Sequence, residues 1–121
     1  MQLEEEDASY LWDMLQTSYD ILEFTREASF AEYCSNKMMR MATERGFQII
    51  GEAARRVSES FRSDHPEIPW SSIVGHRNVV VHDYADLSKG RVWEVIQRDL
   101  PNLVQILERF VSIEPPSLTT E

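Results

Sequence analysis

The sequence predicts an all-α protein, an antiparallel up-and-down bundle of four to five helices. Apolar residues recur at helical spacing over residues 7–26 and 92–111, and a capping motif follows the first of these stretches. No pair of alternating, strand-like runs occurs. With 121 residues and 42% hydrophobic side chains, the chain can bury one core. We therefore expect one helical domain over residues 1–113 and a flexible tail over residues 114–121.

The first helix is expected from Asp7 to about Arg26, because its apolar side chains fall within an arc of about 120°. Ser29 and Glu32 then have the spacing of a capping box, in which the serine and the glutamate each bind a backbone N–H. A second helix is expected to start there and to continue to about Phe61.

Gly46 and Gly51 lie inside this second helix. Because glycine costs about 1 kcal/mol in a helix, each indicates a bend or a close contact with another helix, the alternative being that the helix simply tolerates it. The prolines of His65–Pro69 predict a loop. Pro69 or Trp70 is then expected to open a third helix, since proline suits the first helical turn.

The last helix is expected from Val92 to Val111, where apolar residues again recur at helical spacing. Asp86 and Ser88 are candidate caps before it. A bend is expected at Pro101, which lacks a backbone donor and crowds the preceding turn.

The net charge of −9 argues against non-specific binding of duplex nucleic acid. The charge is unevenly distributed, however. Residues 1–30 hold eight acids and one base, whereas residues 31–60 are slightly basic. The acidic start is either a solvated helix face or a docking surface for a basic partner. Neither a secretion signal nor an apolar run of membrane-spanning length is visible, so a cytoplasmic protein that does not enter a membrane is expected.

Most of the candidate chemistry lies in the stretch GHRNVVVHDY, residues 75–84. On an ideal helix Asn78 and His82 differ by about 40° in direction, and Arg77 and Tyr84 by about 20°. Arg77 and His82 diverge by about 140°. To act on one phosphate they need a long reach by the arginine, a distorted helix, or a contribution from two subunits.

These side chains suit phosphodiester cleavage without a metal. His82 can accept or donate a proton near neutral pH, and Arg77 offers a planar, permanently charged fork for phosphate oxygens. Asn78 can orient His82 or bind the phosphate. RNA is the more natural substrate, because its 2′-hydroxyl is a built-in nucleophile. No His-x-x-x-His pair or cluster of acids predicts a metal site, so no cofactor is expected. The alternative is a surface arginine beside a capping or core histidine.

The stretch IPWSSIVGHRNVVVHDY, with IIGEAARRVSE before it and VWEVIQRDLPNLVQIL after it, closely resembles the HepT-like toxins of the HEPN superfamily. The similarity runs from about residue 8 to residue 112. The resemblance implies a HEPN-like bundle that forms homodimers, with two copies of an Arg-x4-His motif along the cleft where the subunits meet. It also implies a metal-independent endoribonuclease that acts as a toxin.

By this resemblance the motif residues are Arg77, Asn78 and His82, and Tyr84 is the motif tyrosine. HepT-like toxins are paired with an MntA-like nucleotidyltransferase antitoxin, which transfers AMP from ATP to that tyrosine. Glu52 stands where the family often has an acid on the second helix. It either orients His82 or Arg77, or it is a structural partner inside the bundle.

A second class of function uses the same residues differently. The chain is then a non-catalytic helical module, paired with a nucleotidyltransferase, that binds a nucleotide or presents Tyr84 and cleaves nothing. A third reading is an interaction bundle in which the motif occurs by chance. Expression of the chain alone separates a nuclease from both, because only a nuclease degrades RNA.

Overall fold

The computed structural model describes residues 3–74 and 86–112, and within these two ranges it contains helices and no β-strand. All-α architecture is therefore confirmed. The helices are α1 (Glu5–Thr25), α2 (Phe30–Ser35), α3 (Lys37–Arg56), α4 (Glu59–Asp64), α6 (Asp86–Glu94), the π-helical segment η1 (Val95–Asp99) and α7 (Leu100–Leu107). Residues 70–74 are also helical. The predicted tail, residues 114–121, lies outside the described residues.

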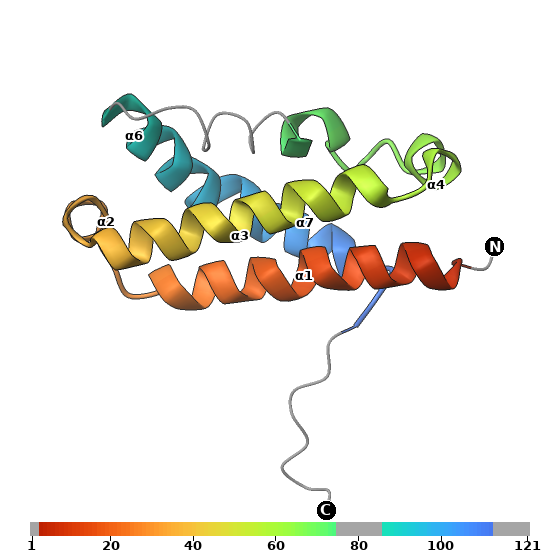
Figure 1. Cartoon of the computed structure of the whole chain (residues 1–121), viewed down its shortest axis with the longest axis horizontal. Coiled ribbons are helices and arrows are strands. Elements are labelled where there is room, and N and C mark those ends of the chain that lie inside the picture. The colour runs from red at the N-terminus through yellow and green to blue at the C-terminus, as the bar shows by residue number, and fades with distance from the viewer. Residues whose placement is uncertain (1–2, 75–85, 113–121) are drawn as a thin grey trace, which may run out of the picture.

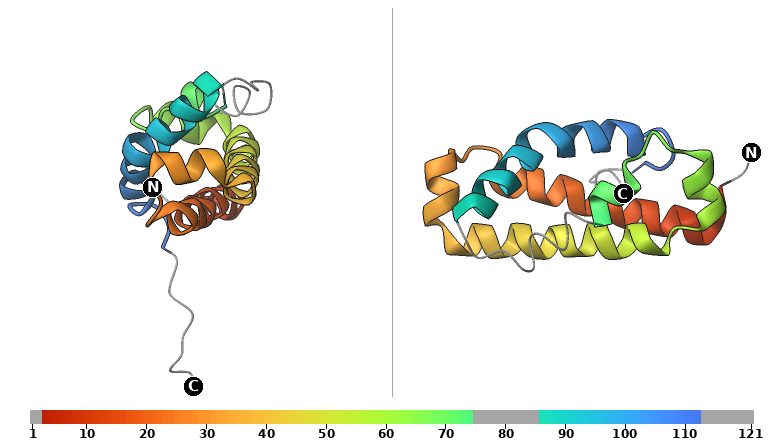
Figure 2. Two further views of the ribbon diagram at one scale, coloured as in Figure 1. Left: turned by 90° about the vertical axis from the view of Figure 1, so that its left-hand side faces the viewer. Right: turned by 90° about the horizontal axis from the view of Figure 1, so that it is seen from above.

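Helix α1 packs against both α3 and α7, and it runs antiparallel to α3 (Figure 1). The end-on view shows the long helices arranged around one common axis (Figure 2). The core is continuous and joins α1, α3, η1 and α7 through large apolar side chains such as Leu15, Ile50, Ile96 and Leu107. The predicted antiparallel bundle is confirmed.

The first predicted helix is confirmed with nearly the predicted bounds. Its buried positions include Leu11, Met14, Leu15 and Ile21, which form the predicted apolar stripe. Asp7 is also buried, and its carboxylate accepts hydrogen bonds from the backbone N–H and the hydroxyl of Ser58, at 2.8 and 2.7 Å. This pair ties the first turn of α1 to the start of α4.

The second predicted helix, from Ser29 to about Phe61, is wrong as a single element, because the chain forms three helices there. The capping box is confirmed: the Ser29 hydroxyl accepts from the Glu32 N–H, and the Glu32 carboxylate accepts from the Ser29 N–H. Asn36 then adopts extended backbone angles, and its side chain accepts from the Met39 N–H.

The same interruption recurs at the end of α3. Val57 is extended, and the Ser58 hydroxyl caps α4 by accepting from the Phe61 N–H. At both breaks a short polar side chain satisfies backbone donors that the preceding helix would otherwise bond. The two turns allow Tyr33 and Phe61 to be buried, at 1% and 6% exposure.

Gly46 marks a close contact between helices, which is one of the predicted readings of its position. A Cβ placed there would lie 2.8 Å from two side-chain carbons of Ile21 and 3.4 Å from Thr17, both on α1. The absence of a side chain therefore lets α3 approach α1 closely.

The last helix begins earlier than predicted, at Asp86, and its irregularity precedes Pro101. Residues Val95–Asp99 form a π-helical turn, in which the Leu100 N–H bonds to the Val95 carbonyl. Pro101 is then accommodated in the first turn of α7. A proline ring crowds the carbonyl four residues before it, and the wider turn relieves this contact.

Candidate functional site

Four of the five predicted site residues lie outside the described residues: Arg77, Asn78, His82 and Tyr84. Their roles and their mutual geometry stay predictions. The structure describes the helix that leads into this segment, the helix that follows it, and the face of α3 beside both. These parts fix where the motif joins the bundle.

The helix before the motif starts where the sequence predicts, at Trp70. The Trp70 indole N–H donates to the His65 carbonyl at 3.0 Å, and the Ile73 N–H donates to the Pro69 carbonyl at the same distance. Ile68, just before this helix, is almost fully buried. These contacts hold the proline loop against the core, and they fix the residue at which the helix before the motif begins.

The helix after the motif is fixed through aromatic packing. Trp93 of α6 lies with its ring centre 5.4 Å from that of Tyr33 and 6.0 Å from that of Phe30. These contacts hold α6 against α2, close to the beginning of α3. The two helices that flank the motif therefore pack beside the middle and the beginning of α3 (Figures 1 and 2).

Glu52 is the one predicted site residue that the structure describes. It lies on α3 and is half-buried, between the buried residues Gly51 and Ala53. Its helical position places it on the same side of α3 as Arg45, seven residues earlier. A role in orienting His82 or Arg77 stays a prediction.

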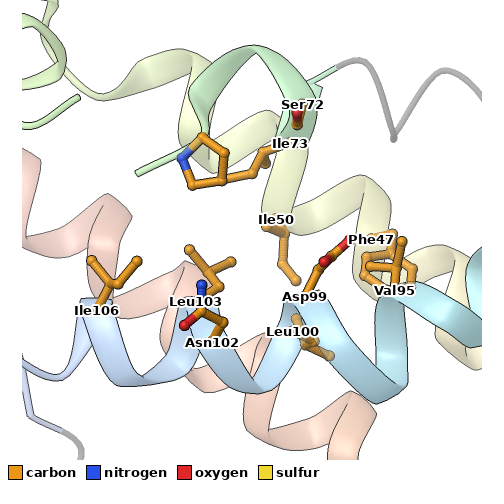
Figure 3. A pocket seen from close by; sticks show the side chains of 11 residues that line it. Phe47, Ile50, Ser72, Ile73, Val95, Asp99, Leu100, Asn102, Leu103 and Ile106 are labelled. Atoms are coloured by element: carbon orange, nitrogen blue, oxygen red, sulfur yellow. The ribbon is translucent and has the colours of Figure 1, made fainter. Parts of the chain in front are cut away.

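A hollow of about 230 Å³ lies between α3, the helix before the motif and the η1–α7 segment (Figure 3). Its wall is mainly apolar, and Ser72, Asp99 and Asn102 are its polar residues. The lining residues are Phe47, Ile50, Pro69, Ser72, Ile73, Val95, Asp99, Leu100, Asn102, Leu103 and Ile106.

This lining contains no basic side chain among the described residues, so the hollow itself is a poor site for phosphate. Sequence reasoning did not identify Asp99 or Asn102 as lining a cavity. Asp99 belongs to the π-helical turn, and such turns often occur at functional sites. Asp99 and Asn102 from the η1–α7 segment thus line the same hollow as Ser72 from the helix that leads to the motif.

Two titratable groups near the junction of α2 and α3 have raised pKa values. Burial raises the pKa of Tyr33 well above its usual range, and the Glu44 carboxylate adds to this effect. Burial also raises the pKa of Glu44, while the neighbouring Arg40 opposes the shift. The Arg40 guanidinium donates to the backbone carbonyls of Tyr33 and Cys34 near the end of α2.

No group of three or more histidine, cysteine, aspartate or glutamate side chains in residues 3–74 and 86–112 could hold a metal ion. Within the same part of the chain, no helix has both the length and the hydropathy needed to cross a membrane.

Comparison with known proteins agrees with the resemblance seen in the sequence. The family described as "Ribonuclease HepT-like" matches residues 14–110. "Putative RNase MJ1380" of Methanocaldococcus jannaschii is 35% identical over 100 residues, covering 83% of this chain and 92% of that protein. "Probable ribonuclease HepT" of Thermococcus cleftensis is 33% identical over 101 residues, covering 84% and 92%. No solved structure gives a significant match. The chain therefore belongs to the HepT-like ribonuclease family.

Proposed function

We propose that this protein is a metal-independent endoribonuclease and the toxin of a cytoplasmic toxin–antitoxin pair. The observation that carries the proposal is the array Arg77-Asn78-x3-His82-x-Tyr84 in a chain of the HepT-like ribonuclease family. The structure supports it by giving the helix before this array a fixed start at Trp70. Family membership alone names a class of enzyme, whereas the array supplies the groups that the reaction needs.

The reaction is an internal transesterification of RNA. The 2′-oxygen attacks the adjacent phosphorus, the bond from phosphorus to the 5′-oxygen breaks, and a 2′,3′-cyclic phosphate remains on one product. His82 accepts the 2′-hydroxyl proton or donates a proton to the departing 5′-oxygen. Arg77 binds the non-bridging oxygens as negative charge builds, and Asn78 holds the imidazole or the phosphate.

We further propose that two copies of the chain form one cleft. Arg77 and His82 diverge by about 140° on a regular helix, so one copy alone presents them poorly to the same phosphate. A two-fold dimer places two arginines and two histidines along a shared groove. One histidine can then accept the proton while the other donates one.

Tyr84 is the proposed point of regulation. An MntA-like nucleotidyltransferase joins the Tyr84 oxygen to the α-phosphorus of ATP, and pyrophosphate leaves as the phenolic proton is released. The attached AMP is bulky and anionic, so it occupies the cleft and repels RNA phosphates. Modification thus switches off binding of the substrate.

The nuclease is tested with purified protein and a labelled single-stranded RNA in the presence of a chelator. Wild type is expected to cleave, whereas Arg77→Ala and His82→Ala are expected to lose cleavage. Matched controls are Arg98→Ala, which removes an exposed arginine paired with Glu94, and His76→Ala, which removes the neighbouring histidine. RNA with 2′-deoxy substitution must resist cleavage. Equal cleavage by all variants would indicate a contaminating nuclease and refute the assignment.

The regulation is tested by intact mass of the protein made with and without its nucleotidyltransferase. An AMP-sized increase that maps to Tyr84, and is lost in Tyr84→Phe, supports the proposal. An unmodified Tyr84 in the presence of active antitoxin contradicts it. If the protein binds nucleotide or antitoxin but never degrades RNA, the non-catalytic module replaces the nuclease.

A further inference from the structure

The two longest helices carry opposite charges although they pack side by side. Helix α1 contains six carboxylates and no basic side chain, whereas α3 contains five basic side chains and two carboxylates. The net charge of −9 hides this separation. A polyanion that is repelled by the net negative charge of the protein can therefore still bind along α3.

Four of the basic side chains of α3 are exposed, namely Lys37, Arg45, Arg55 and Arg56. The fifth, Arg40, is half-buried and engaged with backbone carbonyls. At 100° per residue the four exposed positions fall within an arc of about 100°. They extend over about 28 Å of helix, a length that matches several nucleotides of a single strand.

The same arc carries exposed apolar side chains between the charges. Met38 is 77% exposed and Met41 is 59% exposed. Methionine is polarizable and adapts to varied surfaces, so it can lie against unstacked bases without reading their sequence. The one carboxylate on the arc is Glu52, which is half-buried.

The helices that flank the motif lie near α3, at the middle of its length and near its beginning. Helical residues 70–74, which lead into the motif, meet α3 at Phe47 and Ile50 around the hollow. Helix α6, which follows the motif, packs on α2 next to the beginning of α3. Phe47 and Ile50 are buried, so residues 70–74 approach α3 from the side of the hollow, whereas the basic arc lies on its exposed side.

We propose that the exposed face of α3 binds the sugar-phosphate backbone of a single-stranded RNA substrate. The inference rests on the proposed nuclease function and assigns it a substrate-binding track. A second copy is a poorer occupant of this face, since a two-fold interface brings identical patches together and would oppose like charges. The contacts are to phosphates, so the track gives affinity without sequence preference.

The test measures binding of the full-length protein to a fluorescent, fully 2′-O-methylated RNA strand, which cannot be cleaved. The double variant Arg45→Gln/Arg55→Gln is compared with Arg26→Gln/Arg98→Gln, whose arginines are also exposed but lie off α3. Both doubles change the net charge equally. Each lost phosphate contact is expected to weaken binding by about fivefold at 0.1 M salt and to reduce the salt slope by about 0.7.

The α3 variant is therefore expected to bind about 25-fold more weakly than wild type, with a slope smaller by about 1.4, while the control stays near wild type. If wild type cleaves ordinary RNA but both doubles bind equally, the track is overturned and the nuclease stands. If wild type neither binds nor cleaves RNA, both fail. A change in subunit number in the α3 variant alone would assign the face to a protein interface and also overturn the proposal.

Discussion

Asp7→Ala is expected to destabilise the bundle by about 3 kcal/mol, because it removes the buried link between α1 and α4. The Asp7 carboxylate is 4% exposed and accepts two hydrogen bonds from Ser58, one from the backbone N–H and one from the hydroxyl. A hydrogen bond to a charged group contributes about 1.5–3 kcal/mol. Removal of the cost of burying the carboxylate offsets part of the sum, which leaves about 3 kcal/mol.

Urea unfolding followed by helical circular dichroism measures this loss, and protein concentration is held constant because the unfolding of a dimer depends on it. Asp7→Asn keeps the shape and one acceptor, and it is expected to cost about 1 kcal/mol. Glu6→Ala is the control. It removes an exposed carboxylate from the same first turn, so its effect is limited to the helix-dipole contribution, about 0.3–1 kcal/mol.

A double-mutant cycle separates the link from other roles of Asp7. Ser58→Ala removes the hydroxyl that binds Asp7 and caps the Phe61 N–H, yet it leaves the backbone bond to Asp7 in place. The coupling energy between the two substitutions is expected to be about 1–2 kcal/mol. Purely additive losses, or an Asp7→Ala effect no larger than that of Glu6→Ala, would refute the reasoning.

Three further substitutions test the packing of the bundle. Gly46→Ala gains about 1 kcal/mol of helix propensity, but its methyl group would lie 2.8 Å from buried Ile21. A net loss of about 1 kcal/mol in the free energy of unfolding by urea is expected. A net gain would show that the Ile21 side chain can move away from the added methyl group. Thr43→Val is expected to stabilise by about 1 kcal/mol in the same assay, since the buried Thr43 hydroxyl has no hydrogen-bond partner among the described residues; a loss would reveal one. Burial raises the pKa of Tyr33, so the folded state keeps a proton that the unfolded state releases above about pH 10. The contribution of Tyr33 to the free energy of unfolding is complete below that pH and is lost as the pH rises further. Tyr33→Phe is therefore expected to reduce the fall of the urea midpoint above that pH. If the midpoint of Tyr33→Phe falls as steeply as that of wild type, other groups cause the loss.

The amphipathic pattern was sufficient to predict α1, because its buried side chains form one apolar stripe that packs against α3 and α7. The long helix predicted from Ser29 to Phe61 failed for a tertiary reason. Its residues favour a helix throughout, and Asn36 and Ser58 are equally compatible with an exposed helix position or a cap. Only the burial of Tyr33 and Phe61 decides between these states, and that depends on helices distant in sequence.

The candidate site shows a similar division. The helix before the motif could be predicted from Pro69 and Trp70, because both signals are local. The hollow beneath it could not, because it needs side chains from α3, residues 69–73 and the η1–α7 segment together. The π turn that contributes Asp99 depends on how Pro101 is accommodated against the rest of the bundle, and no short-range pattern specifies it.

The separation of charge between α1 and α3 determines how strongly the net negative charge opposes RNA binding at α3. Neighbouring helices pack about 8–10 Å apart, and the exposed side chains of each extend further into solvent. At physiological ionic strength the screening length is about 8 Å, so the carboxylates of α1 only weakly oppose an anion bound at Arg45 or Arg55. At low salt the screening length reaches about 30 Å, and the repulsion from α1 becomes comparable with the attraction from α3. The number of phosphate contacts predicts how steeply the affinity for RNA rises as the salt concentration falls. Below about 0.05 M salt, the affinity is therefore expected to rise less steeply than this prediction. If the logarithm of the RNA association constant stays linear in the logarithm of the salt concentration over that range, the carboxylates of α1 do not repel the bound RNA.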